Sequence, residues 1–123
     1  MPSALRAQVD QLASALPGAS LALAVHGELE SWKVGGKMFA CFGTMQTGVS
    51  VKCPDVETAS MLIAARVAER APYFHRSWVR LPETVEAAEL RHRLLASYRL
   101  VRAGLPVRLR RDLPDPPPEF PEL

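Results

Sequence analysis

The chain has 123 residues, of which 48% are hydrophobic and 23% charged, the balance of one globular domain with a single core. No apolar run approaches the ~20 residues that a membrane-spanning helix needs, and the first residues lack the basic-then-apolar order of a signal peptide. Two cysteines are too few for a disulfide framework or a four-cysteine zinc site. We therefore expect a cytoplasmic protein with no membrane association, no metal and no cofactor.

Charge is distributed unevenly along the chain. Residues 1–65 carry a net charge of −1, residues 66–111 carry +7 from eleven arginines and four glutamates, and residues 112–123 carry −4. A basic stretch followed by an acidic end indicates a preference for anionic partners, or an attraction between the end of the chain and its body.

An amphipathic helix is predicted near the N-terminus. Ser3 is a suitable N-cap, and Pro17-Gly18 stops the pattern. The apolar residues that recur at helical spacing are Leu5, Val9, Leu12 and Leu16.

The next stretch alternates as strands do. Residues 20–26 are apolar and predict either a strand or a packed loop. Residues 30–34 predict a strand, Gly35-Gly36 a turn, and residues 37–43 and 48–53 a further hairpin.

The register of that hairpin follows from placing Phe42 opposite Val49. Alternation then directs six residues toward the core, namely Met38, Ala40, Phe42, Val49, Val51 and Cys53. Cys41 and Cys53 fall on opposite faces and should not form a disulfide. A strict two-residue turn would set the inward Val34 opposite Lys37, so we expect a longer loop or a bulge near Gly36.

Two more helices and a strand follow. Asp55 should cap the second helix, which ends before Pro72, and residues 77–81 form a short strand. Thr84 should cap the third helix, which Gly104 and Pro106 close. The expected inward stripe of the second helix is Val56, Ser60, Ile63 and Val67. That of the third is Ala87, Leu90, Leu94, Tyr98 and Val101.

These elements predict one α+β domain over residues 1–111. Three helices should cover one face of an antiparallel four- to five-stranded sheet and leave the other face partly open. Residues 112–123 form a proline-rich acidic tail that we expect to be disordered.

The open face is expected to carry basic and aromatic side chains. Those on its strands are Lys33, Lys37, Phe39, Lys52, Trp78 and Arg80, and the preceding loop adds Tyr73, His75 and Arg76. Cations contact phosphates and rings stack on unpaired bases, so the set suits nucleic acid. An alternative interpretation is that the lysines only keep an exposed sheet soluble and prevent it from pairing with other chains. Arg108, Arg110 and Arg111 either extend this surface or solubilise the end of the third helix.

Four segments in the same order resemble the MmcQ/YjbR-like family. They are Trp32-Lys-Val-Gly-Gly-Lys-Met-Phe-Ala40, Val51-Lys-Cys53, Pro72-Tyr-Phe-His-Arg-Ser-Trp-Val79, and Ser97-Tyr-Arg-Leu-Val101 with Leu105-Pro106. The resemblance covers roughly residues 5–110 and implies a frataxin-like sandwich, a proposed DNA-binding role through a double-wing surface, and no agreed enzymatic activity.

Residue by residue, Lys37, Lys52, Trp78 and Tyr98 match motif positions of that family. One departure is His26-Gly27 where members carry Phe-Gly, which leaves the role of that aromatic open. True frataxins bind iron through an acidic first helix. Here that helix has a single acid, Asp10, so iron binding is not carried across.

No nucleophile, base and orienting partner converge in the pattern, so we do not expect an enzyme. His26, His75 and His92 are scattered along the chain. We interpret His75 as a hydrogen-bonding loop residue in preference to a general base. Cys41 is either an inert buried thiol or a reactive one beside lysines. The acidic tail either folds back on the basic face and competes with an anionic partner, or stays free.

Three functions remain open on the sequence alone. The first is DNA binding through the open face. The second is a pocket for a small anionic ligand or metabolite near Trp78, His75 and Cys41. The third is a protein-interaction module anchored by Trp78 and Phe39.

Overall fold

The computed structural model describes residues 3–24, 29–43 and 47–120. His26 and Gly27, where the family pattern departs, lie outside the described residues. In chain order the elements are α1 (Ala4–Ser14), β1 (Ala19–Ala22), β2 (Ser31–Val34), β3 (Lys37–Cys41), β4 (Val49–Lys52), α2 (Val56–Ala64), β5 (Glu69–Arg70), β6 (Trp78–Leu81), α3 (Ala87–Ala103) and α4 (Val107–Arg110).

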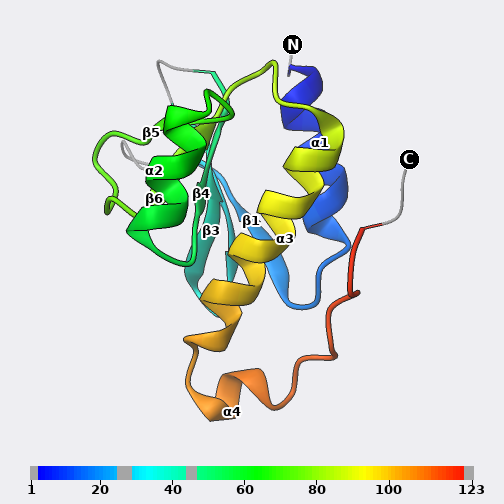
Figure 1. Ribbon diagram of the computed structural model, residues 1–123. Helices are drawn as coiled ribbons and strands as arrows, with labels where there is room; N and C mark the ends of the chain where they lie inside the picture. The colour runs from blue at the N-terminus through cyan, green and yellow to red at the C-terminus, as the bar shows by residue number, and fades with distance from the viewer. Residues whose placement is uncertain (1–2, 25–28, 44–46, 121–123) are drawn as a thin grey trace.

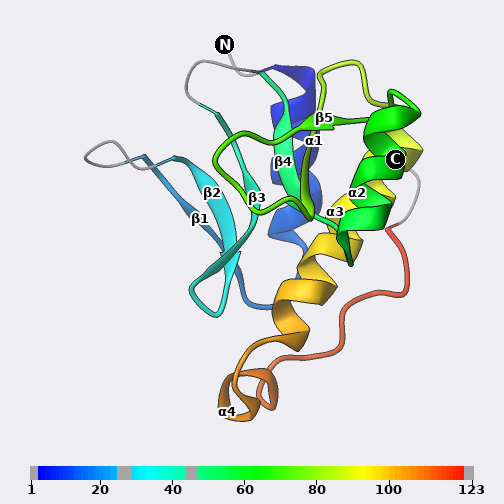
Figure 2. The same cartoon turned by 60° about the vertical axis from the view of Figure 1, so that its left-hand side comes forward.

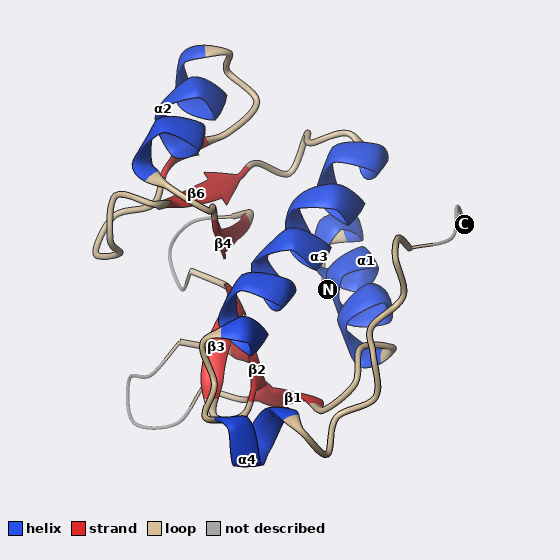
Figure 3. Ribbon diagram, turned by 60° about the horizontal axis from the view of Figure 1, so that its bottom comes forward, coloured by secondary structure: helices blue, strands red, loops and turns tan. Residues whose placement is uncertain are grey.

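The strands form one antiparallel sheet in the order β1-β2-β3-β4-β6-β5. Helices α1, α2 and α3 lie on one face of this sheet, and α1 packs beside α3 (Figures 1 and 3). The predicted α+β class with one open face is confirmed. The sheet has six strands because β5, only two residues long, adds an edge that is too short to show periodicity.

Two of the three predicted helix caps are confirmed. Ser3 Oγ accepts the backbone N–H of Arg6 at 3.1 Å, and Asp55 Oδ1 accepts that of Thr58 at 2.7 Å. The hydrogen bonds from Thr58 favour the carboxylate and hold the pKa of Asp55 below its usual value. Thr84 is not a cap. Residues 82–85 form a turn in which the Val85 N–H bonds the Pro82 carbonyl, and α3 begins only at Ala87.

The stripe predicted for α2 is wrong at two of its four positions, Ser60 and Ile63, whereas Val56 is half-buried and Val67, just after the helix, packs against the core. The buried residues of α2 are Ala59 and Leu62, whereas Ser60 is exposed and Ile63 is 37% exposed. The reason is that α2 makes its main contacts with β6 and β5 at one edge of the sheet, so a narrow face of the helix suffices. In α3 the predicted inner face is confirmed from Leu90 to Val101, but its first member, Ala87, is exposed.

The hairpin register is confirmed, with Ala40 opposite Val51 and Cys41 opposite Ser50. The bulge exists, but not at Gly36. Gly35 and Gly36 form a tight two-residue turn with φ of 58° and 80°, and Val34 pairs with Lys37. The bulge lies further along the hairpin, where the register shifts between Trp32 and Lys33. Trp32 pairs with Ala40, while Lys33 pairs with Met38.

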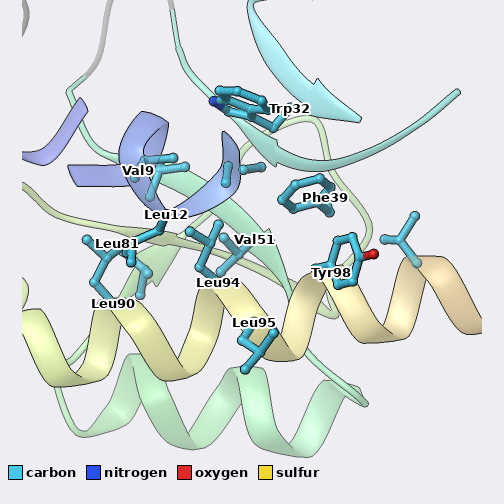
Figure 4. Packing of buried hydrophobic residues seen from close by; sticks show 14 of the residues in the cluster. Val9, Leu12, Trp32, Phe39, Val51, Leu81, Leu90, Leu94, Leu95 and Tyr98 are labelled. Atoms are coloured by element: carbon cyan, nitrogen blue, oxygen red, sulfur yellow. The ribbon is translucent and has the colours of Figure 1, made fainter. Parts of the chain in front are cut away.

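Phe39 is the extra residue at this bulge, and its side chain turns into the core instead of the open face. It is fully buried and meets Tyr98 of α3 edge to face, with ring centroids 5.4 Å apart and an interplanar angle of 86° (Figure 4). Met38, predicted to point inward, is half-buried and pairs with Lys33 on the face away from the helices.

Residues after α4 run back along the outer side of α3, away from the sheet (Figure 2). Arg102 donates to the carbonyls of Leu113 and Pro114, and Arg99 to those of Pro117 and Pro118. Phe120 is buried. In this arrangement the segment touches α3, so it does not cover the open face. The prediction that residues 112–123 are disordered in solution stays a prediction.

Candidate nucleic-acid interface

On the sheet face opposite the helices, side chains of neighbouring strands form rows that differ in their exposure to solvent. Where strands pair, partners share a face, so Ser31, Cys41, Ser50 and Arg80 form one row across β2, β3, β4 and β6. The small members of this row are buried, with exposed fractions of 1% for Ser31 and Cys41 and 8% for Ser50. The accessible part of the face is therefore the neighbouring row, where Lys52 pairs with Trp78.

Trp78 does not stand alone on this face. Its ring stacks on that of Phe74, with centroids 4.8 Å apart and an interplanar angle of 23°. Phe74 was missed in the sequence, although a ring four residues before Trp78 across a short loop was a usable signal. The stack fixes the orientation of the Trp78 indole beside Lys52.

The loop of residues 71–77 carries the most exposed ring of the described chain. Tyr73 has an exposed fraction of 105% and a left-handed backbone conformation with φ of 73°. His75 and Arg76 follow it and are also exposed. The loop thus leaves the Tyr73 ring free in solvent, directly before Phe74 of the stacked pair in the sequence.

His75 has a structural role within this loop. Its Nδ1 accepts the backbone N–H of Ser77 at 3.1 Å and lies 2.9 Å from the Ser77 Oγ. The backbone N–H must donate, so Nδ1 is the acceptor of this hydrogen bond. The geometry agrees with the interpretation of His75 as a hydrogen-bonding loop residue.

Arg80 faces the open side but is held by partners. It forms an ion pair with Glu69 of β5, and its Nη1 donates to the Thr47 carbonyl at 2.9 Å. These contacts tie β5, and Thr47 two residues before β4, to β6. Arg80 is therefore a weaker candidate for a phosphate contact than Lys52.

The remaining predicted cations are spread over the molecule. Lys33 is half-buried on the open face. Lys37 pairs with Val34, whose side chain is in the core, so it lies at the end of the helix-covered face. Arg108 and Arg110 of α4 and the following Arg111 sit at the C-terminal end of α3, far from the 71–77 loop (Figures 1 and 2). The structure does not bring these arginines to Trp78.

Both cysteines are free and buried. Cys53 belongs to the core cluster, whereas Cys41 lies on the other face, as the register predicted. Burial raises the pKa of Cys41 to about 11, because the thiolate loses its hydration. Burial and the raised pKa both favour the interpretation of Cys41 as an inert buried thiol.

Two hollows lined by described residues lie on the helix side of the sheet. A groove of about 780 Å³ runs between α3 and the C-terminal segment, with Arg91, His92, Arg99, Leu95 and Phe120 among its lining. A smaller one of about 320 Å³ lies between the start of α3 and the end of α2, lined by Arg66 and Glu89 among others. Neither involves Trp78, His75 or Cys41, where a ligand pocket was expected.

Within residues 3–24, 29–43 and 47–120, no group of three or more His, Cys, Asp or Glu side chains could hold a metal ion. Asp10 is occupied structurally, because it accepts the Trp32 indole N–H at 2.8 Å and pairs with Arg6. Among the described helices, none has the length and apolar character to cross a membrane.

The comparisons with known proteins agree with this fold. The crystal structure of Deinococcus radiodurans protein DR2400, which carries the domain DUF419, is similar with a TM-score of 0.72 and 23% identity, over 85% of this chain and 83% of that chain. At this identity the likeness shows a shared fold alone. No curated protein matches. The family model YjbR matches residues 14–100, which is more than half of the chain. The chain therefore belongs to the YjbR family.

Proposed function

We propose that this protein binds DNA through the surface formed by Lys33, Lys52, Tyr73, Arg76 and Trp78, with single-stranded or locally unpaired DNA as the preferred form. The observation that carries the proposal is the fully exposed Tyr73 ring beside the Phe74–Trp78 stack. Exposed rings next to cations are what unpaired bases and their phosphates require.

Charge supports the same surface. Residues 66–80 contain four arginines and one glutamate, and that glutamate pairs with Arg80. Arg76 is exposed in the loop, and Lys33 and Lys52 are half-buried on the open face, whereas Arg70 pairs with the core residue Val79 and Arg66 lines the hollow beside α2. Phosphates that approach this surface would thus meet Arg76 of the loop and the lysines of β2 and β4. Phe39 is buried, so it cannot anchor a protein partner as the third function required.

Removing two cations tests the electrostatic part. The double variant Lys52→Ala and Arg76→Ala should bind a fluorescent single-stranded oligonucleotide more weakly, and its log affinity should fall less steeply with log salt concentration, by about 1.4 in slope. Fluorescence anisotropy at several salt concentrations measures both. Arg91→Ala is the matched control, because it removes a cation from the outer side of α3. Equal weakening by the control, or no binding by the wild type at low salt, would reject the proposal.

Tyr73 tests the aromatic part. Tyr73→Ala should lower the affinity for single-stranded DNA by about 1–3 kcal/mol, the cost of one lost base stack, and leave the salt slope unchanged. Affinity for duplex DNA should change far less, because duplex bases are already stacked. Tyr73→Phe keeps the ring and is the control. A similar loss for both oligonucleotides would argue against base stacking.

A small anionic ligand is the second candidate function, and the groove along α3 favours it over the Trp78 region. Arg91, His92 and Arg99 line the groove together with apolar Leu95 and Phe120, and its volume falls in the range of ligand pockets. The anionic dye anilinonaphthalene sulfonate should bind saturably there, with fluorescence that Arg91→Ala reduces and Arg76→Ala does not. Equal fluorescence in all three proteins would place the dye elsewhere.

A further inference from the structure

The two edges of the sheet are built differently. β5 at one edge has two residues, Glu69 and Arg70, both charged and exposed. Short charged edges prevent a sheet from pairing with another chain. β1 at the other edge has four residues, and the sequence Ala-Ser-Leu-Ala-Leu-Ala-Val from residue 19 to residue 25 contains no charge and no proline. Only the β5 edge is therefore protected by charged residues against pairing with another chain.

Large apolar side chains are exposed along the unprotected edge. Leu21 is 37% exposed and Leu23 is 61% exposed. Leu21 pairs with Trp32, which places it on the helix side of the sheet. α1 packs near β1 yet leaves Leu21 accessible. Exposed leucines next to an edge strand are costly for a monomer and useful at an interface.

We propose that β1 pairs antiparallel with β1 of a second copy of this chain, so that the two six-stranded sheets join into one. A strand without charges offers no electrostatic basis for selecting a charged peptide. A two-fold axis pairs the strand with itself, so the same uncharged residues meet on both sides. The outward backbone N–H and C=O groups of β1 gain partners, and the leucines of the two copies cover one another.

The geometry of this pairing has a consequence for the open face. The two-fold axis of an antiparallel edge pairing stands perpendicular to the sheet, so both open faces point to the same side. The dimer would present two copies of the 71–77 loop at its outer ends, because β6 and β5 lie at the sheet edge away from β1. The pairing itself does not depend on what those faces bind.

Sedimentation velocity over a wide concentration range tests the proposal. The wild-type mass should rise from 13.5 kDa toward twice that value with concentration. Leu23→Lys should remain at the monomer mass, because it places a charge beside the strand pair. Met61→Lys on α2 is the matched control, since Met61 is 59% exposed and far from β1 in the fold; it should dimerise as the wild type does.

Circular dichroism of each variant reports the fold independently of mass. A wild type that stays at 13.5 kDa at every concentration would overturn the proposal. So would a folded Leu23→Lys variant that still dimerises, or a folded Met61→Lys variant that is monomeric. A mass that grows beyond the dimer would also contradict it, since a two-fold pairing of one edge closes after two copies.

Discussion

Replacing Phe39 with alanine should lower the free energy of unfolding by about 3–5 kcal/mol, the usual cost of removing a buried phenylalanine ring from a packed core. The ring is fully buried and meets Tyr98 edge to face, so the substitution leaves a cavity and also removes an aromatic contact. Urea denaturation followed by circular dichroism measures the change. A loss of this size is a large share of the stability of a domain this small.

Met38→Ala is the matched control for this measurement. Met38 is the neighbouring large apolar residue, but it is half-buried on the opposite face, so its truncation should cost much less. DNA affinity of the folded fraction of Phe39→Ala should equal that of the wild type. If Phe39→Ala were as stable as the wild type and bound DNA more weakly, Phe39 would belong to the open face after all.

The parts of the fold that the sequence predicts well depend on interactions between residues that are close in sequence. Ser3 and Asp55 sit where a side-chain oxygen is needed by a helix start, and neither depends on distant residues. The β3–β4 register follows from alternation alone, since Ala40 and Val51 must both be buried. Lys52 and Trp78 consequently lie on the face away from the helices, as predicted.

The predictions are wrong where contacts with distant parts of the chain determine how a side chain is oriented or paired. Strict alternation places Phe39 outside, but the bulge turns it inward, where Tyr98, distant in sequence, provides its contact. Nothing within residues 37–43 specifies that partner. Similarly, Arg80 looks like a free cation until β5 brings Glu69 beside it. The candidate interface thereby shifts from the whole strand face to the Lys52–Trp78 row and the 71–77 loop.

Charge patterning was also a poor guide to the C-terminal segment. An acidic tail predicted attraction between carboxylates and arginines, but Arg99 and Arg102 donate to backbone carbonyls of the segment. Such bonds do not depend on the sign of the tail side chains. Since the segment lies on α3, masking of the open face by its acids finds no support in this arrangement (Figure 2). What anchors the end is an apolar side chain, Phe120.

Replacing Phe120 with alanine should therefore lower the free energy of unfolding by about 3 kcal/mol. Phe120 is 7% exposed and belongs to the core cluster, so its removal exposes apolar surface on α3 and leaves the carbonyl bonds of Arg99 without their apolar neighbour. Urea denaturation measures the loss. Glu119→Ala changes the preceding exposed residue and should leave stability within about 0.5 kcal/mol.

The same pair of variants decides whether the segment is mobile. A disordered tail contributes nothing to folding, so in that case Phe120→Ala would match Glu119→Ala. A packed segment makes the two differ by the full cost of the buried ring. The result also bears on the groove along α3, because Phe120 forms part of its lining and the groove exists only while the segment is in place. A stable Phe120→Ala protein that still binds the anionic dye would separate dye binding from the packed segment.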